Sequence, residues 1–149
     1  MSLPNTIETD IIDQIIIRLS EIREGENYFT TVVTVDDNRS TPYEEEEMPA
    51  INIVDGNIEV ESEQVSSSTY HTLGMNIDLI VLVANDDAMY IRNLLSDIQK
   101  AIGKDITWGG KAFHTELLGI ERDIVDQQNN KIANARIRIK IIYRKKQWE

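Results

Sequence analysis

The stretch ANARIRIKIIYR, residues 133–144, decides the fold because its apolar and charged residues alternate over most of its length. Side chains point to opposite faces of a β-strand in turn, so the alternation predicts a strand with one buried and one charged face. The predicted buried face holds Ala135, Ile137, Ile139, Ile141 and Tyr143. The predicted charged face is a basic stripe of Arg136, Arg138, Lys140 and Arg144.

The positive charge of the chain is gathered near its C-terminal end. The net charge is −11 over 149 residues, yet from Lys131 onward seven Lys and Arg stand against one acidic residue. Up to Asn130 the count is eight Lys and Arg against 25 Asp and Glu. This segregation indicates an interaction surface, because complementary charges steer association and fix its register.

Length and composition predict one globular domain over residues 1–149. Hydrophobic residues make up 41% and charged residues 28%, which are ordinary globular values. The absence of cysteine excludes disulfides, thiolate catalysis and Cys-ligated zinc. The apolar runs are far shorter than the ~20 residues of a membrane span, and the N-terminus lacks a signal-peptide layout. We therefore expect an intracellular protein without membrane contact.

The first half of the chain predicts a helix, a strand and an acidic loop. Residues 6–23 carry apolar residues at helical spacing, with Asn5 and Glu8 as the expected N-terminal cap and Gly25 as the expected stop. Residues 28–35 are rich in aromatic and β-branched residues, which favour a strand. Residues 36–47 combine turn formers with four consecutive glutamates, whose repulsion favours an extended, solvated loop.

The middle of the chain predicts two short strands, a central strand and a second helix. A strand over residues 49–56 should end at Asp55 and Gly56, and residues 58–63 alternate as a further strand. Residues 70–85 are apolar on both faces in their second half, which indicates the middle of a sheet. A helix over 87–102 should be capped by Asp86, bury Met89 with its apolar face, and stop at Gly103.

Residues 115–125 and 133–144 predict a β-hairpin joined by residues 126–131. The full element order then defines an α+β fold. We expect a mainly antiparallel sheet with two helices packed on one face, a protruding acidic loop and a C-terminal β-hairpin.

Two alternatives follow for the charged residues. The basic stripe can pair within the subunit, with Glu121 and Asp123 or with Glu59, Glu61 and Glu63, and we favour this alternative for the strand itself. The cations that extend past the alternation are better placed for an outside partner, and the glutamates can order against a neighbouring subunit. The candidate interaction residues are Glu44, Glu45, Glu46, Glu47, Arg136, Arg138, Lys140, Arg144, Lys145 and Lys146.

No catalytic, metal or cofactor motif accompanies these residues. His71 and His114 are the only histidines and lack a ligand or nucleophile partner at a recognisable spacing. Four adjacent glutamates do not provide the spaced oxygen ligands and glycine turn of a calcium loop. Residues 66–69 and the WGGK stretch lack the signatures of a nucleophile elbow and a phosphate loop. We expect no enzyme activity and no cofactor, and we do not expect nucleic acid, because the acidic remainder repels a polyanion.

Taken together, the chain resembles the tail terminator (minor tail) proteins of long-tailed bacteriophages. The resemblance lies in IETDIIDQIIIRLSEI, an acidic loop running into EMPAINI, LGMNIDLIVLVA, AMYIRNLLSDIQKAIG and ARIRIKIIYR. It implies a homohexameric ring that caps the tail tube, stops its polymerisation and offers a head-attachment surface. The implied partners are further copies, the tail tube protein and a head-completion protein. The implied location is the host bacterial cytoplasm during assembly and then the virion tail.

Two other roles stay open. A neck or head-completion protein is the nearest alternative, and a nucleic-acid-binding module using the basic strand is a more remote one.

Overall fold

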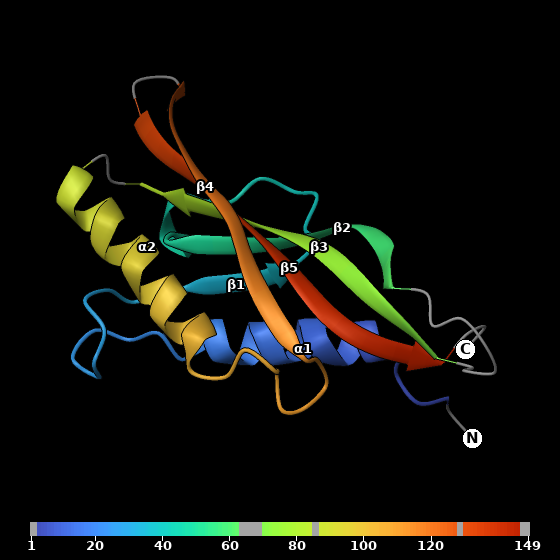
Figure 1. Cartoon of the computed structure of the whole chain (residues 1–149). Coiled ribbons are helices and arrows are strands. Elements are labelled where there is room, and N and C mark those ends of the chain that lie inside the picture. Colours follow the sequence, from blue (N-terminus) through green and yellow to red (C-terminus); the bar gives the residue numbers. More distant parts are fainter. Residues whose placement is uncertain (1–2, 63–69, 85–86, 128–129, 147–149) are drawn as a thin grey trace.

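The computed structural model describes residues 3–62, 70–84, 87–127 and 130–146 of the chain. Helix α1 and strand β1 come first, then a short 3-10 turn, strands β2 and β3, helix α2, and strands β4 and β5 (Figure 1). Their bounds are α1 Ile7–Ser20, β1 Thr34–Asp37, the 3-10 turn Glu45–Glu47, β2 Ala50–Ser62, β3 Tyr70–Val83, α2 Ala88–Gly103, β4 His114–Gln127 and β5 Asn130–Lys146. The predicted α+β class is confirmed.

The five strands form one sheet in the order β1-β2-β3-β5-β4. β1 runs parallel to β2, and the other three pairings are antiparallel. β3 is the middle strand, as its apolar second half predicts. β4 and β5 form the predicted hairpin, whose residues 128–129 lie outside the described residues.

The core lies between the two helices and one face of the sheet. β5 turns its alternate residues to this face as predicted, and Ile137, Ile139, Ile141 and Tyr143 are almost fully buried. α1 and α2 cover them with the apolar residues of their inner faces (Figure 1). The helical contribution includes Ile11, Ile15, Leu19, Leu94 and Ile98. Burying these side chains stabilises the fold by about 1.5–3 kcal/mol each before entropy is counted.

In both helices the N-cap residue lies one position after the predicted one. The Thr6 hydroxyl, not Asn5, accepts a hydrogen bond from the Thr9 amide at 3.2 Å. Asp87, not Asp86, caps α2 by accepting from the Met89 amide at 3.1 Å. Met89 was predicted to be buried, but 62% of its surface is exposed.

The end of α1 also differs from the prediction. The helix ends at Ser20 and is capped by Glu21, so Gly25 does not terminate it. Gly25 instead has a φ of 89° in the following loop, beside the isolated bridge between Glu24 and Tyr28. Its left-handed conformation favours glycine for that reason.

The strand predicted over residues 28–35 is largely wrong, since only Thr34–Asp37 is a strand. The buried Asp97 carboxylate on α2 accepts hydrogen bonds from the Phe29 and Thr30 amides and from the Thr30 hydroxyl. These bonds draw the chain toward the helix and take donors that a sheet neighbour would need, so tertiary contacts override the β-propensity.

β2 is one long strand where two short strands were predicted. Its pairing with β3 shifts register between Asp55 and Ile58, so Asp55 and Gly56 lie at an irregularity within the strand. The extra residue of a bulge bends a strand without ending it. Glu63 and residues 66–69 lie outside the described residues.

Candidate interaction surfaces

The basic stripe of β5 lies on the sheet face opposite the helices, and Arg136, Arg138 and Lys140 are paired with carboxylates of the same subunit. Arg136 and Arg138 approach the Asp78 carboxylate at 3.9 and 4.0 Å, and Arg138 also lies 3.4 Å from Glu121. Asp78 enters because it stands directly opposite Arg138 in the β3–β5 register. These distances agree with pairing inside the subunit, which was the favoured alternative. Such half-exposed pairs contribute only about 0–1 kcal/mol each.

Lys140 is the most enclosed cation of the stripe. Its ammonium contacts Glu61 and lies 3.9 Å from Glu59. The pair crosses over Gly74, where a side chain would collide with the ends of both Glu61 and Lys140. The hydrogen bond with Glu61 raises the pKa of Lys140 and keeps it charged. Arg136, Arg138 and Lys140 are therefore matched by carboxylates of their own subunit.

Lys145 also has an internal partner, which the sequence did not predict. Its ammonium lies 2.9 Å from the Glu8 carboxylate, and the Tyr143 hydroxyl donates to the same carboxylate at 2.6 Å. Burial alone would raise the pKa of Glu8, but the hydrogen bonds from Tyr143 and Lys145 outweigh it and lower that pKa. Burial and the bond to Glu8 raise the pKa of Tyr143. The network ties the first turn of α1 to the end of β5.

A basic pocket lies between the start of α1 and the ends of β3 and β5. Its volume is about 570 Å³, and Lys111, Arg144, Lys145 and Lys146 supply its positive charge. Among the described residues, Asp10 is the one carboxylate in its wall, 3.9 Å from Lys111. The remaining wall comes from Leu3, Pro4, Asn5, Thr6, Ile7 and Tyr70. The pocket therefore offers several cations beside an apolar and aromatic surface.

Arg144 is held in place by aromatic rings. Its guanidinium lies 5.9 Å from the centre of the Tyr70 ring and 5.7 Å from that of Phe113. Cation–π contacts of this kind contribute about 0.5–1 kcal/mol at exposed sites and leave the N–H donors available. Within the described residues no ion pair involves Arg144 or Lys146, in contrast to Arg136, Arg138, Lys140 and Lys145.

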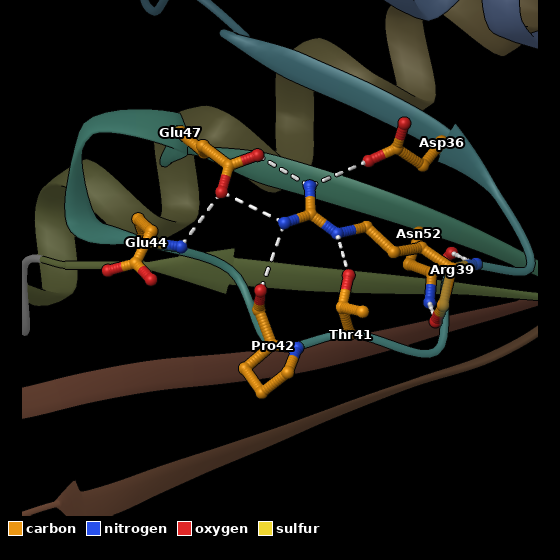
Figure 2. Close-up of polar contacts among 7 residues, drawn as sticks. All are labelled: Asp36, Arg39, Thr41, Pro42, Glu44, Glu47 and Asn52. Carbon is orange, nitrogen blue, oxygen red and sulfur yellow. Dashed lines mark hydrogen bonds and ion pairs between the residues drawn. The ribbon is translucent and has the colours of Figure 1, made fainter.

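The four glutamates form an acidic turn, residues 44–47, rather than the predicted extended loop. Glu45–Glu47 make one turn of 3-10 helix. The reason is Arg39, whose guanidinium donates to Glu47 at 2.5 and 2.9 Å, to Asp36 at 3.2 Å, to the Thr41 hydroxyl at 2.9 Å and to the Pro42 carbonyl at 2.9 Å (Figure 2). These contacts use the full donor fork of arginine, so one cation organises the turn.

Within the described part of the chain, Glu47 is the one glutamate of the acidic turn that pairs with a cation. Hydrogen bonds from Arg39 and from the Glu44 amide lower the pKa of Glu47 to about 2. Figure 2 shows the Glu44 carboxylate pointing away from the guanidinium. Glu44, Glu45 and Glu46 are exposed to solvent. The turn therefore presents three carboxylates on a backbone that Arg39 fixes.

The acidic turn and the basic pocket lie at opposite ends of the sheet. The segment leading into the turn lies against Leu82 and Asn134, at the end of β3 and the start of β5. The pocket lies at Tyr70 and Lys146, which are paired at the other end of the same two strands. The 12 positions from Asn134 to Lys146 correspond to about 40 Å of strand. The two surfaces cannot meet in one subunit.

Apolar residues are exposed on β4, which is an edge strand of the sheet. Leu117, Leu118 and Ile120 are 53%, 52% and 37% exposed, and they cluster around a register shift between Leu117 and Gly119. An edge strand with exposed apolar residues is suited to contact with another chain.

We also searched the described residues for a metal site, a membrane-spanning helix and a histidine cluster. No group of three or more His, Asp or Glu among them is arranged to hold a metal ion. Within the same residues, neither helix is long and apolar enough to cross a bilayer. His71 lies half-buried and His114 exposed on strands, away from each other in the β3–β5–β4 pairing.

Neither a protein-family model nor a curated protein sequence matches this chain. The resemblance to tail terminators therefore rests on the layout of the sequence segments along the chain. The geometry of the surfaces described above carries the functional interpretation.

Proposed function

We propose that this chain is a structural assembly subunit resembling phage tail terminators. Its copies form a closed ring that caps the tail tube, stops tube polymerisation and offers a surface for head attachment. The observation that best supports the proposal is the placement of complementary charges at opposite ends of one sheet. A separation of about 40 Å exceeds the Debye length several-fold, so the charges are matched only by another molecule.

A head-to-tail arrangement of copies uses such a pair of surfaces directly. In a heterologous contact one patch meets a different patch of the next copy, and a rotation that closes gives a ring in place of a filament. Charged contacts fix register and speed encounter, while apolar area supplies most of the affinity. Leu117 and Leu118 on β4 are exposed apolar residues that can add such area.

The tail role comes from the resemblance. It makes the tail tube protein and a head-completion protein the partners, and it places the protein in the host cytoplasm before it joins the virion tail. The role requires binding without turnover, so we propose no catalytic activity.

The test is tube growth measured by negative-stain electron microscopy, with the tail tube protein of the same phage polymerising in the presence of this protein. We expect tubes to stop growing and to carry a ring at one end. Tubes that keep growing with bare ends would contradict the proposal. Binding to the portal side of the head, with no effect on tubes, would replace it with a neck role.

A further inference from the structure

We propose that the basic pocket receives the acidic turn of a neighbouring copy. Glu44, Glu45 and Glu46 of one subunit then dock against Arg144 and Lys146 of the next. The inference rests on the proposed ring and names the contact that joins its subunits.

The pocket suits carboxylates because its positive charge exceeds its negative charge. Its described wall holds four cations and one carboxylate, and Glu8, which lies outside that wall, pairs with Lys145. Lys111 has a distant ion pair with Asp10 at 3.9 Å. Arg144 and Lys146 are exposed, so the guanidinium of the first and the ammonium of the second are accessible to a bound carboxylate. A volume of about 570 Å³ is enough for the side chains at the tip of a turn.

The acidic turn is prepared for docking. Arg39 fixes its backbone through Glu47, and the Arg39 amide and carbonyl are held by the Asn52 side chain at 2.9 Å each. A turn that is already ordered loses less conformational entropy when it binds. The Arg39–Glu47 pair therefore acts on the contact indirectly, by holding the three outer glutamates in a single arrangement.

An acidic turn fits this pocket better than a nucleic acid does. The wall includes Leu3, Pro4 and Ile7, which offer no hydrogen-bond partner to a phosphate backbone that runs across the pocket. The net charge of −11 repels a long polyanion from the rest of the surface. The acidic turn brings three exposed carboxylates to the pocket itself, whereas a long polyanion also runs over the acidic remainder of the surface.

Two reciprocal charge-reversal variants test the contact. The pocket variant is Arg144→Glu with Lys146→Glu, and the turn variant is Glu45→Lys with Glu46→Lys. In each variant alone, the pocket of one copy and the turn of the next carry the same charge. We therefore expect its self-association to weaken by about tenfold or more. When the two variants are mixed, alternating copies restore every contact. Native mass spectrometry should then detect rings with equal numbers of the two variants.

The control variant reverses exposed cations elsewhere, Arg23→Glu with Arg92→Glu, and should form rings like the wild type. Circular dichroism checks that all variants fold. If each variant alone still forms rings, or if the two variants do not assemble when mixed, the docking contact is wrong. The proposal of a ring would then still stand. A wild-type protein that never forms rings would overturn the proposed function itself. A pocket variant that still forms rings but no longer binds tube ends would also overturn docking between copies.

Discussion

Asp97 is the buried acid that organises the segment after α1. Only 1% of its surface is exposed, and its carboxylate accepts from the Phe29 amide, the Thr30 amide at 2.8 Å and the Thr30 hydroxyl at 2.6 Å. At the scale of single residues, such polar contacts determine where the chain departs from its local propensity, because a buried donor without an acceptor is costly.

Replacing Asp97 with alanine should lower the free energy of unfolding by about 3 kcal/mol, because it leaves buried amide donors without an acceptor. Asp97→Asn keeps one carbonyl acceptor and should lose less. The exposed neighbour variant Ser96→Ala is the control, with a change under about 0.5 kcal/mol. Urea denaturation measures all three. An Asp97→Ala protein as stable as the control would contradict the assigned role.

The bond between Tyr143 and Glu8 should appear in the pH dependence of stability. The folded pKa of Glu8 is lowered from its ordinary value of 4.5, so its contribution is present above pH 4.5 and is lost as pH falls through the folded pKa. Tyr143→Phe removes one of its donors and should raise the pKa of Glu8. The cost should be about 1–2 kcal/mol at pH 7 and smaller at pH 3.

Carboxyl NMR titration of Glu8 and urea unfolding at the two pH values check this prediction. Tyr90→Phe is a matched control, since Tyr90 does not contact Glu8 among the described hydrogen bonds. An unchanged Glu8 titration in Tyr143→Phe would contradict the effect of the Tyr143 hydroxyl on the pKa of Glu8.

At the scale of elements, the acidic turn depends on a cation that precedes it in the chain. Arg39 stacks over the Tyr43 ring at 4.1 Å while its donors hold Glu47 and Asp36. The low pKa of Glu47, about 2, means that the ion pair persists above pH 4.5 and weakens only as pH falls toward 2. The turn is therefore ordered throughout the neutral and mildly acidic range.

Arg39→Ala should open the turn, because Glu47 loses its partner while the four like charges remain. Backbone amide hydrogen exchange at Glu44 and Glu47 should become at least about tenfold faster. Arg39→Lys should rescue it poorly, since an ammonium cannot reproduce the planar fork. Arg23→Ala is the exposed control. Exchange that stays slow in Arg39→Ala would mean that the backbone orders itself.

The sequence predicts elements well where one physical rule dominates. The two-residue period of β5 identifies its buried face, and the doubly apolar half of β3 identifies the centre of the sheet. The caps were missed by one residue because Asn and Thr, or two adjacent Asp, can all accept the capping bond. Residues 28–33 and the acidic turn were missed because Asp97 and Arg39 act through folded contacts that no local pattern reveals.

The candidate interaction residues could also be predicted only in part, because their partners come from folded contacts. Alternation correctly separates the basic stripe from the core, but it does not show which cations find carboxylates in the subunit. The structure pairs Arg136, Arg138 and Lys140 internally and also takes up Lys145, whose partner Glu8 is 137 positions away. What remains for an outside partner is the outer part of the pocket, around Arg144 and Lys146.

At the scale of the whole molecule, the charge layout has a consequence for assembly. The acidic turn and the basic pocket carry opposite charge and are separated along β3 and β5. In the proposed ring, copies joined head to tail bring the two surfaces together, and closure limits their number.

Sedimentation velocity of the wild-type protein over a wide range of concentration tests this account most directly. We predict a single closed species of six copies, about 103 kDa from subunits of 17.1 kDa, which does not grow further as concentration rises. Higher salt should shift the balance toward subunits. A 17.1 kDa monomer at every concentration, or continuous growth into filaments, would contradict it.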